Sequence, residues 1–304
     1  MNNDINKEQN KKEYLRYRFV SRKLYSEEKK YRNFIIIIGV VTYLIGLIPS
    51  LKNMRLISII PIIWLVASEI FKRVKSNIHL RAVEYHEYCD RRMFGLTELE
   101  NLLDNKDILF QEAIDITEDE KEKKLFEDMI KKENKISINN WYNDFSGLPL
   151  DIAIIMTQDE NITWERKQRE SYRMLLNFVI IALGSISILA IFYKTNDMLN
   201  VIFAVPILLE IVLLILDNCD NIKKCRFIQR KVGKSYNEIR NNGKNYNVKF
   251  MENICNEIQF KIYENRKDSI PVPDIVYYMF RSRLQKQSNL YMKNIKEEML
   301  NALK

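Results

Sequence analysis

Aromatic and basic side chains alternate over part of the chain, in a pattern that suits a ligand with bases and phosphates. A guanidinium group can form paired hydrogen bonds with a phosphate, and an aromatic ring can stack on a base. The same residue types also anchor helices at a membrane interface, which is the competing interpretation. We predict a ligand-binding site formed by Arg91, Arg92, Trp141, Tyr142, Trp164, Arg166, Arg169, Tyr172 and Arg173.

A single carboxylate interrupts the apolar segment LNVIFAVPILLEIVLLIL at residues 199–216. Acidic residues inside a membrane usually face a water-filled path or the interior of a helix bundle. Two alternatives stay open for Glu210: it lines a pore together with Pro206 and Glu69, or it forms a buried hydrogen bond with the preceding apolar segment. Candidate partners in that segment are Asn177, Ser185 and Ser187.

A pore would need more than one chain, because four helices are too few to enclose a wide aqueous path. We therefore expect a homo-oligomer, in which a ring of Glu210 carboxylates would favour cations. Pro206 cannot donate a hydrogen bond to the carbonyl group of Ile202, so the helix can bend there. This bend is a candidate gate.

The chain has no sequence motif of a common catalytic site, since GxSxG, P-loop, HExxH and GxGxxG segments are all missing. His79 and His86 stand seven residues apart and could share a helix face, but no second cluster of metal ligands accompanies them. We expect a protein that is not an enzyme and that needs no metal or other cofactor.

Four apolar blocks dominate the chain, although 29% of its 304 residues are charged. A helix needs about 20 apolar residues to cross a bilayer, and the four blocks reach or approach this length. Only a few residues separate the blocks within each pair, which predicts two antiparallel helical hairpins. Buried helices of a soluble core are the alternative, and the lack of a polar face disfavours it. The blocks are residues 34–50, 56–70, 174–193 and 199–216.

Lysine and arginine residues flank each pair of blocks on one side and predict the orientation. They precede the first and third blocks and follow the second and fourth, whereas the two short loops hold Lys52, Arg55 and Lys194. By the positive-inside rule, both termini and the long middle region face the cytoplasm. Topology explains much of the formal net charge of +8, so this charge does not indicate binding of DNA or RNA. The first flank holds Arg22, Lys23, Lys29, Lys30 and Arg32.

The predicted fold is an all-α membrane protein with two transmembrane hairpins, four spans in all, and a helical cytoplasmic domain. We expect a cytoplasmic N-terminal helix at residues 1–33, hairpins at residues 34–71 and 174–216, a cytoplasmic helical insert at residues 72–173 and a cytoplasmic helical tail at residues 217–304.

Patterns in the cytoplasmic regions predict further helices. A polar helix should follow the fourth block to about Asn241, and the apolar spacing from Met251 to Ile262 predicts an amphipathic helix. In the segment IPVPD, Pro273 should separate two helices and Asp274 should cap the second.

Several segments resemble the SMODS-associated four-transmembrane effectors of bacteria, and they follow the order of that family along most of the chain. In this chain Ser-Arg stands at residues 21–22, where Gln-Arg is commoner in the family. The similar segments are INKEQN…SRKLYSEEKK, RRMFGL, WYNDFSGLPLDIAIIMTQDENITWERKQRESYR and RKDSIPVPDIVYYMFRSRLQ.

The resemblance implies an effector encoded beside a cyclic-oligonucleotide synthase in an antiphage signalling system. It implies that a cyclic di- or trinucleotide is the partner, that the protein resides in the bacterial inner membrane, and that the activated protein disrupts this membrane and arrests the infected cell. It supplies no residue-level ligand site. The alternative is a membrane-anchored interaction protein, or an ordinary ion channel gated by a protein partner.

Overall fold

The computed structural model describes residues 5–48, 59–97, 99–100, 102, 105–131, 137–193 and 198–304. In these ranges all regular secondary structure is helical, so the predicted all-α fold is confirmed. The predicted loop at residues 51–55, and residues 194–197 of the second loop, lie outside the described residues. The elements are α1 (Ile5–Glu8), α2 (Lys12–Gly46), α4 (Ile60–Phe94), α6 (Lys106–Glu118), α7 (Glu120–Ile130), α8 (Leu150–Tyr193), α9 (Met198–Asn242), the 3₁₀ turn η2 (Gly243–Asn245), α10 (Val248–Asp268) and α11 (Asp274–Ala302).

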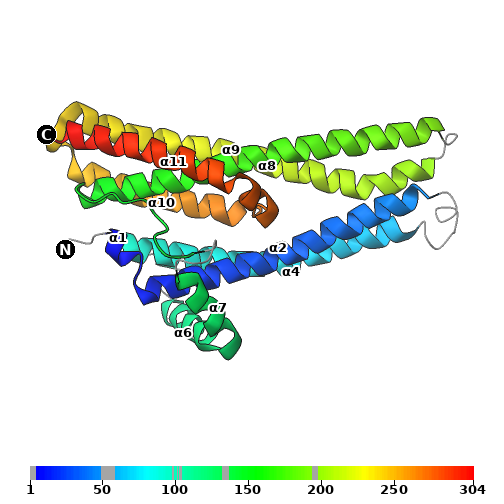
Figure 1. The fold of residues 1–304 in the computed structure, drawn as a ribbon, viewed down its shortest axis with the longest axis horizontal. Helices are drawn as coiled ribbons and strands as arrows, with labels where there is room; N and C mark the ends of the chain where they lie inside the picture. Colours follow the sequence, from blue (N-terminus) through cyan, green and yellow to red (C-terminus); the bar gives the residue numbers. More distant parts are fainter. Residues whose placement is uncertain are drawn as a thin grey trace.

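Four long helices set the shape of the molecule, and each runs without a break through one predicted domain boundary. The pairs α2–α4 and α8–α9 lie along the length of the molecule, with their apolar halves at one end (Figure 1). Both chain termini lie at the opposite end, where α10 and α11 pack on α8 and α9. Each apolar half is therefore connected to the polar end by continuous helix.

The apolar halves carry the features of membrane helices. By length and composition, α8 and α9 are each apolar enough to cross a bilayer. Large apolar side chains also point outward on all four long helices, an arrangement that is unfavourable in water and suits contact with lipid. Examples are Ile37, Leu44, Ile62, Ile63, Phe178, Ile181, Leu209 and Leu213.

The two hairpins pack against each other through a close contact between α2 and α9. A Cβ atom added at Gly46 would lie 2.3 Å from Cβ of Phe203, and one at Gly39 would lie 3.3 Å from Cδ1 of Ile207. Small residues let helix backbones approach closely in a membrane. Tyr43 adds a hydroxyl contact to Ser187 of α8 at 3.2 Å, so α2 touches both helices of the second hairpin.

The cytoplasmic tail agrees with the predicted pattern. α9 ends at Asn242, one residue beyond the predicted end, and the apolar positions from Met251 to Ile262 are buried on one face of α10. The break between α10 and α11 is also confirmed, but the predicted cap is wrong. Pro273 occupies the N-cap position and Asp274 is the first helical residue. The Asp274 carboxylate forms an ion pair with Lys29 of α2 at 2.5 Å and makes no cap hydrogen bond.

Candidate ligand-binding cavity

A cavity of about 530 Å³ lies in the polar half of the molecule, which we call the cytoplasmic half after its predicted location. The cavity is lined by residues of α2, α4, α7, α8 and the start of α11. Seven basic and four acidic side chains line it, so its charged groups favour an anion. Its size falls in the range of roughly 300 to 1,000 Å³ that is usual for small-molecule sites. The basic residues are Arg18, Arg22, Lys23, Lys29, Lys30, Arg169 and Arg266, and the acidic residues are Glu27, Glu122, Glu165 and Asp274.

Aromatic side chains line opposite parts of this cavity. Trp164 of α8 lies with its ring centroid 6.3 Å from that of Tyr277, and Tyr277 makes an edge contact with Tyr278 at 5.3 Å. Trp141, from the loop before α8, lies 6.5 Å from the ring of His86 and is 41% exposed. Accessible aromatic rings beside fixed cations can stack on bases while the cations contact phosphates.

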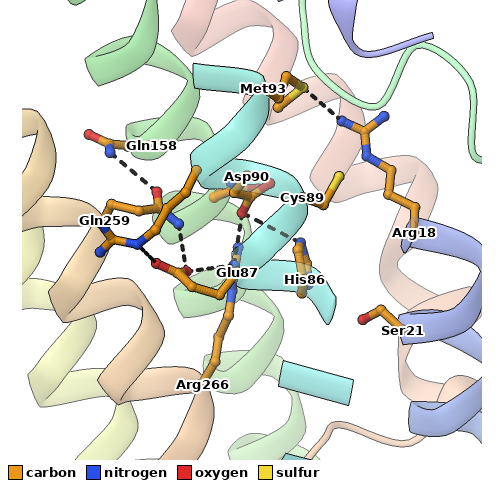
Figure 2. A network of polar contacts seen from close by, with 12 residues as sticks. Arg18, Ser21, His86, Glu87, Cys89, Asp90, Met93, Gln158, Gln259 and Arg266 are labelled. Carbon is orange, nitrogen blue, oxygen red and sulfur yellow. Dashed lines mark hydrogen bonds and ion pairs between the residues drawn. The ribbon is translucent and has the colours of Figure 1, made fainter. Parts of the chain in front are cut away.

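A buried polar network holds part of the cavity wall in place (Figure 2). Arg266 of α10 donates to Asp90 of α4 at 2.9 Å, and His86 lies 3.7 Å from the same carboxylate. Gln259 donates to Glu87 at 2.8 Å. The two acidic residues stand one turn apart on α4, so one helix face orients the Arg266 guanidinium at the cavity.

Burial shifts the pKa values of two residues in this network. It raises the pKa of Glu87 to about 7, although the charges of Arg91 and Arg266 act in the opposite direction. It lowers the pKa of His86 to about 3, helped by the charge of Arg266. His86 is therefore neutral near pH 7, and the permanent positive charge at this wall comes from Arg266 and from Arg18, which contacts Met93.

Three of the nine residues in the sequence-predicted site line the cavity: Trp141, Trp164 and Arg169. Arg169 is held there by Glu165 at 3.0 Å. Trp164 and Arg169 both lie on α8, whereas Trp141 comes from the loop before it.

The other six residues have different surroundings. Arg91 pairs with Glu87, Arg92 contacts the Tyr88 hydroxyl, and Tyr142 donates to Asp90. Arg166 pairs with Glu170, Tyr172 is buried in the core at the base of the hairpins, and Arg173 lies 3.8 Å from the sulfur of Cys219.

Sequence reasoning missed the contribution of α2 and of the start of α11. Arg22, Lys23, Lys29 and Lys30 count in the sequence as a topological flank, yet here they also line the cavity. The adjacent pair Tyr277 and Tyr278 was the remaining signal, because two exposed aromatics after a proline-rich break are unusual in a solvated helix. Nothing in the sequence alone indicates that these segments meet.

The three candidate pore-lining residues, Glu210, Pro206 and Glu69, lie in different environments. Glu210 is 6% exposed and lies 3.0 Å from Nζ of Lys72 on α4, so it pairs across the two hairpins of one chain. Pro206 is buried within α9, one turn closer to the centre of the apolar half, and Glu69 is exposed. Ser187, one candidate partner of Glu210, instead contacts Tyr43 and the carbonyl group of Leu183.

Within the residues that the structure describes, no group of three or more His, Cys, Asp or Glu side chains could hold a metal ion. Both histidines line the cavity, but each has another partner. His79 contacts Glu28 at 2.8 Å and the carbonyl group of Arg266 at 2.9 Å. His86 lies beside Asp90 and Trp141.

An all-α chain whose long helices have outward-facing apolar halves belongs to the class of helical membrane proteins. The family model of the SMODS-associating 4TM effector domain matches residues 3–295, and the chain belongs to this family. It is therefore a membrane effector of cyclic-nucleotide-based antiphage signalling systems. No curated protein and no solved structure matches the chain.

Proposed function

We propose that a cyclic di- or trinucleotide binds in the cytoplasmic cavity and activates this effector to disrupt the inner membrane. The supporting observation is that the cavity combines seven basic side chains with the accessible rings of Trp141 and Trp164, and that α2 and α8, which supply several of these groups, continue into the hairpins. A cyclic oligonucleotide presents two or three phosphates and the same number of bases. The cations would contact the phosphates, and Trp164 and Trp141 would stack on bases.

The proposed topology has four spans, with both termini and the cavity in the cytoplasm of the bacterial cell. In this orientation a messenger made in the cytoplasm reaches the cavity directly. Thiols introduced at Asn53 and Asn196 should react with a membrane-impermeant reagent added outside the cell, and a thiol at Gly147 should not. Reaction at Gly147 in intact cells would contradict this topology.

We propose further that activated chains assemble into a homo-oligomer whose shared axis is lined by Glu210. In one chain this carboxylate pairs with Lys72, so the pair must separate before Glu210 can face water. Pro206 gives α9 a position at which it can bend to allow that change. A ring of carboxylates would make the opened path prefer cations.

Isothermal titration calorimetry of the purified full chain against a panel of cyclic di- and trinucleotides tests the ligand proposal. At least one of them should bind, and Trp164→Ala should weaken its binding by about 10- to 100-fold, since a stacked base contributes about 1 to 3 kcal/mol. Arg226→Gln is a matched control, because Arg226 pairs with Glu170 of α8 outside the cavity. Binding by none of the panel would contradict the proposal and favour activation by a protein partner.

A further inference from the structure

The connection between α10 and α11, residues 269–273, lies where the two hairpins enter the cytoplasmic half. Val272 and Val276 are buried in one apolar cluster with Tyr43 of α2 and with side chains of both helices of the second hairpin. Proline at positions 271 and 273 stiffens this connection. We call residues 269–276 the wedge, because its apolar side chains fill the space between the bases of the hairpins.

Three cations from the long helices hold the wedge in place. Lys29 of α2 pairs with Asp274 at 2.5 Å, and Arg169 of α8 donates to the carbonyl group of Ile270 at 3.2 Å. Arg32 of α2 donates to the carbonyl group of Pro271. Charged side chains therefore hold the wedge, and these side chains could bind other partners instead. Two of the three acceptors are backbone carbonyl groups of the wedge.

The buried guanidinium group of Arg32 is an energetically unfavourable feature of the seated wedge. Its side chain is 1% exposed, and its Nε and Nη2 atoms have no hydrogen-bond partner among the described residues. No carboxylate in the described part of the chain forms an ion pair with it. Buried donors without hydrogen-bond partners are destabilising, so the seated wedge leaves two guanidinium donors that another conformation could satisfy.

Two of the three cations that hold the wedge also line the cavity. Lys29 and Arg169 both belong to its wall, as do Pro271, Val272 and Asp274 of the wedge itself. A phosphate would repel the Asp274 carboxylate and would accept hydrogen bonds from Lys29 and Arg169. Charge-assisted bonds to phosphate are stronger than bonds to a neutral carbonyl group, so an anion in the cavity competes directly with the contacts of the wedge.

We infer that the wedge transmits occupancy of the cavity to the membrane: an anionic ligand draws Lys29 and Arg169 away from it, and the wedge then leaves the space between the hairpins. The inference rests on the proposed function for the identity of the ligand. A ligand shifts a conformational equilibrium only if it binds one state more tightly. The state with the wedge released meets this condition, because only there are both cations free for phosphate.

Cysteine reactivity at two adjacent positions measures the position of the wedge. Val276 is fully buried, whereas Ile275 is 68% exposed. Val276→Cys and Ile275→Cys are compared in full-length protein in lipid nanodiscs, with Cys219→Ser removing the native thiol that is partly exposed. We expect a maleimide to label Val276→Cys at least about tenfold faster when a cyclic nucleotide that binds in calorimetry is present, with Ile275→Cys labelled fast in both conditions.

A second experiment tests the wedge inference without a ligand. Asp274→Asn removes the ion pair with Lys29 and should raise the labelling rate of Val276→Cys by about two- to fivefold, as expected for loss of a partly exposed ion pair. Asp268→Asn is the matched control, because Asp268 ends α10 and pairs with Lys224 outside the wedge.

The outcomes separate this inference from the proposed function. If a cyclic nucleotide binds but Val276→Cys labels no faster, the wedge inference is overturned and the ligand proposal stands. If none of the cyclic nucleotides binds, the ligand proposal fails, and the labelling rate in the Asp274→Asn variant then tests the wedge inference. Equal labelling rates for Asp274→Asn and Asp268→Asn would then overturn it, and a faster rate for Asp274→Asn alone would support it.

Discussion

The cytoplasmic and apolar halves of the same four helices are stabilised by different kinds of contact. In the cytoplasmic half, charged side chains are buried in pairs such as Asp90 with Arg266 and Glu87 with Arg91. In the apolar half, the contact between hairpins depends on the backbone at Gly39 and Gly46.

The difference follows from the two surroundings. In water, a core gains free energy from apolar burial, and its polar groups must be paired. In lipid, helices gain little by burying apolar surface, so close packing and a few polar contacts determine their association. Under the proposed function, we therefore expect the contact between hairpins to rearrange during activation while the cytoplasmic half keeps its packing.

The largest predicted effect is in the cytoplasmic network. Arg266→Met leaves Asp90 buried without its cation and should lower the free energy of unfolding by about 3 to 5 kcal/mol. Thermal unfolding of the full chain in detergent measures this. Arg226→Met removes an exposed ion pair and should cost less than about 1 kcal/mol. Equal effects of the two changes would mean that the network does not stabilise the cytoplasmic half.

The contact between hairpins gives the next largest effect. At Gly46 an added methyl group would overlap Phe203, so Gly46→Ala should destabilise the protein by about 1 to 3 kcal/mol. At Gly184 the same change meets no atom within 4 Å and should be neutral or slightly stabilising, since alanine favours helix. Thermal unfolding should show a loss of stability at Gly46 and no loss at Gly184. Phe203→Gly, which removes the Cβ atom that the added methyl group would meet, should suppress the effect at Gly46. Stabilisation at both positions would contradict the packing of the hairpins.

Local patterns allowed much of the fold to be predicted from the sequence. The apolar blocks, the amphipathic α10 and the break at Pro273 all depend on residues close together in the chain. The cavity could not be predicted in the same way, because Lys29, Trp164 and Tyr277 are more than 100 residues apart and meet only through packing. Asp274 shows the same limit: its position favours a helix cap, but a cation from α2 competes for the carboxylate.

Glu210 lies at the boundary between the two halves, and ion selectivity tests its role. If Glu210 lines the opened path, Glu210→Gln should move the reversal potential of the activated protein in a salt gradient towards zero, and Glu210→Lys should reverse or block the current. Glu257→Gln, on α10 where the carboxylate pairs with Lys231, is the control and should have little effect. Unchanged cation preference in Glu210→Gln would leave the carboxylate with a structural role as the partner of Lys72.

The smallest predicted effect is a pH dependence of the cytoplasmic network. The pKa of Glu87 is raised from its ordinary value of 4.5 to about 7, so the folded state holds this proton more strongly than the unfolded state. The free energy of unfolding should therefore fall as the pH rises from about 4.5 through 7. Glu87→Gln stays neutral, and its stability relative to the wild type should rise over this interval. A difference that is independent of pH would contradict the raised pKa.

Release of a dye trapped in vesicles tests most directly whether the cavity controls the membrane. Full-length protein is reconstituted in vesicles of bacterial lipids, and the cyclic nucleotide that binds in calorimetry is added from the side of the cavity. We predict that the nucleotide triggers release, and that Trp164→Ala reaches the same final release but needs about 10- to 100-fold more nucleotide. Release at the same rate without nucleotide, or an identical nucleotide requirement in Trp164→Ala, would contradict control of the membrane by this cavity.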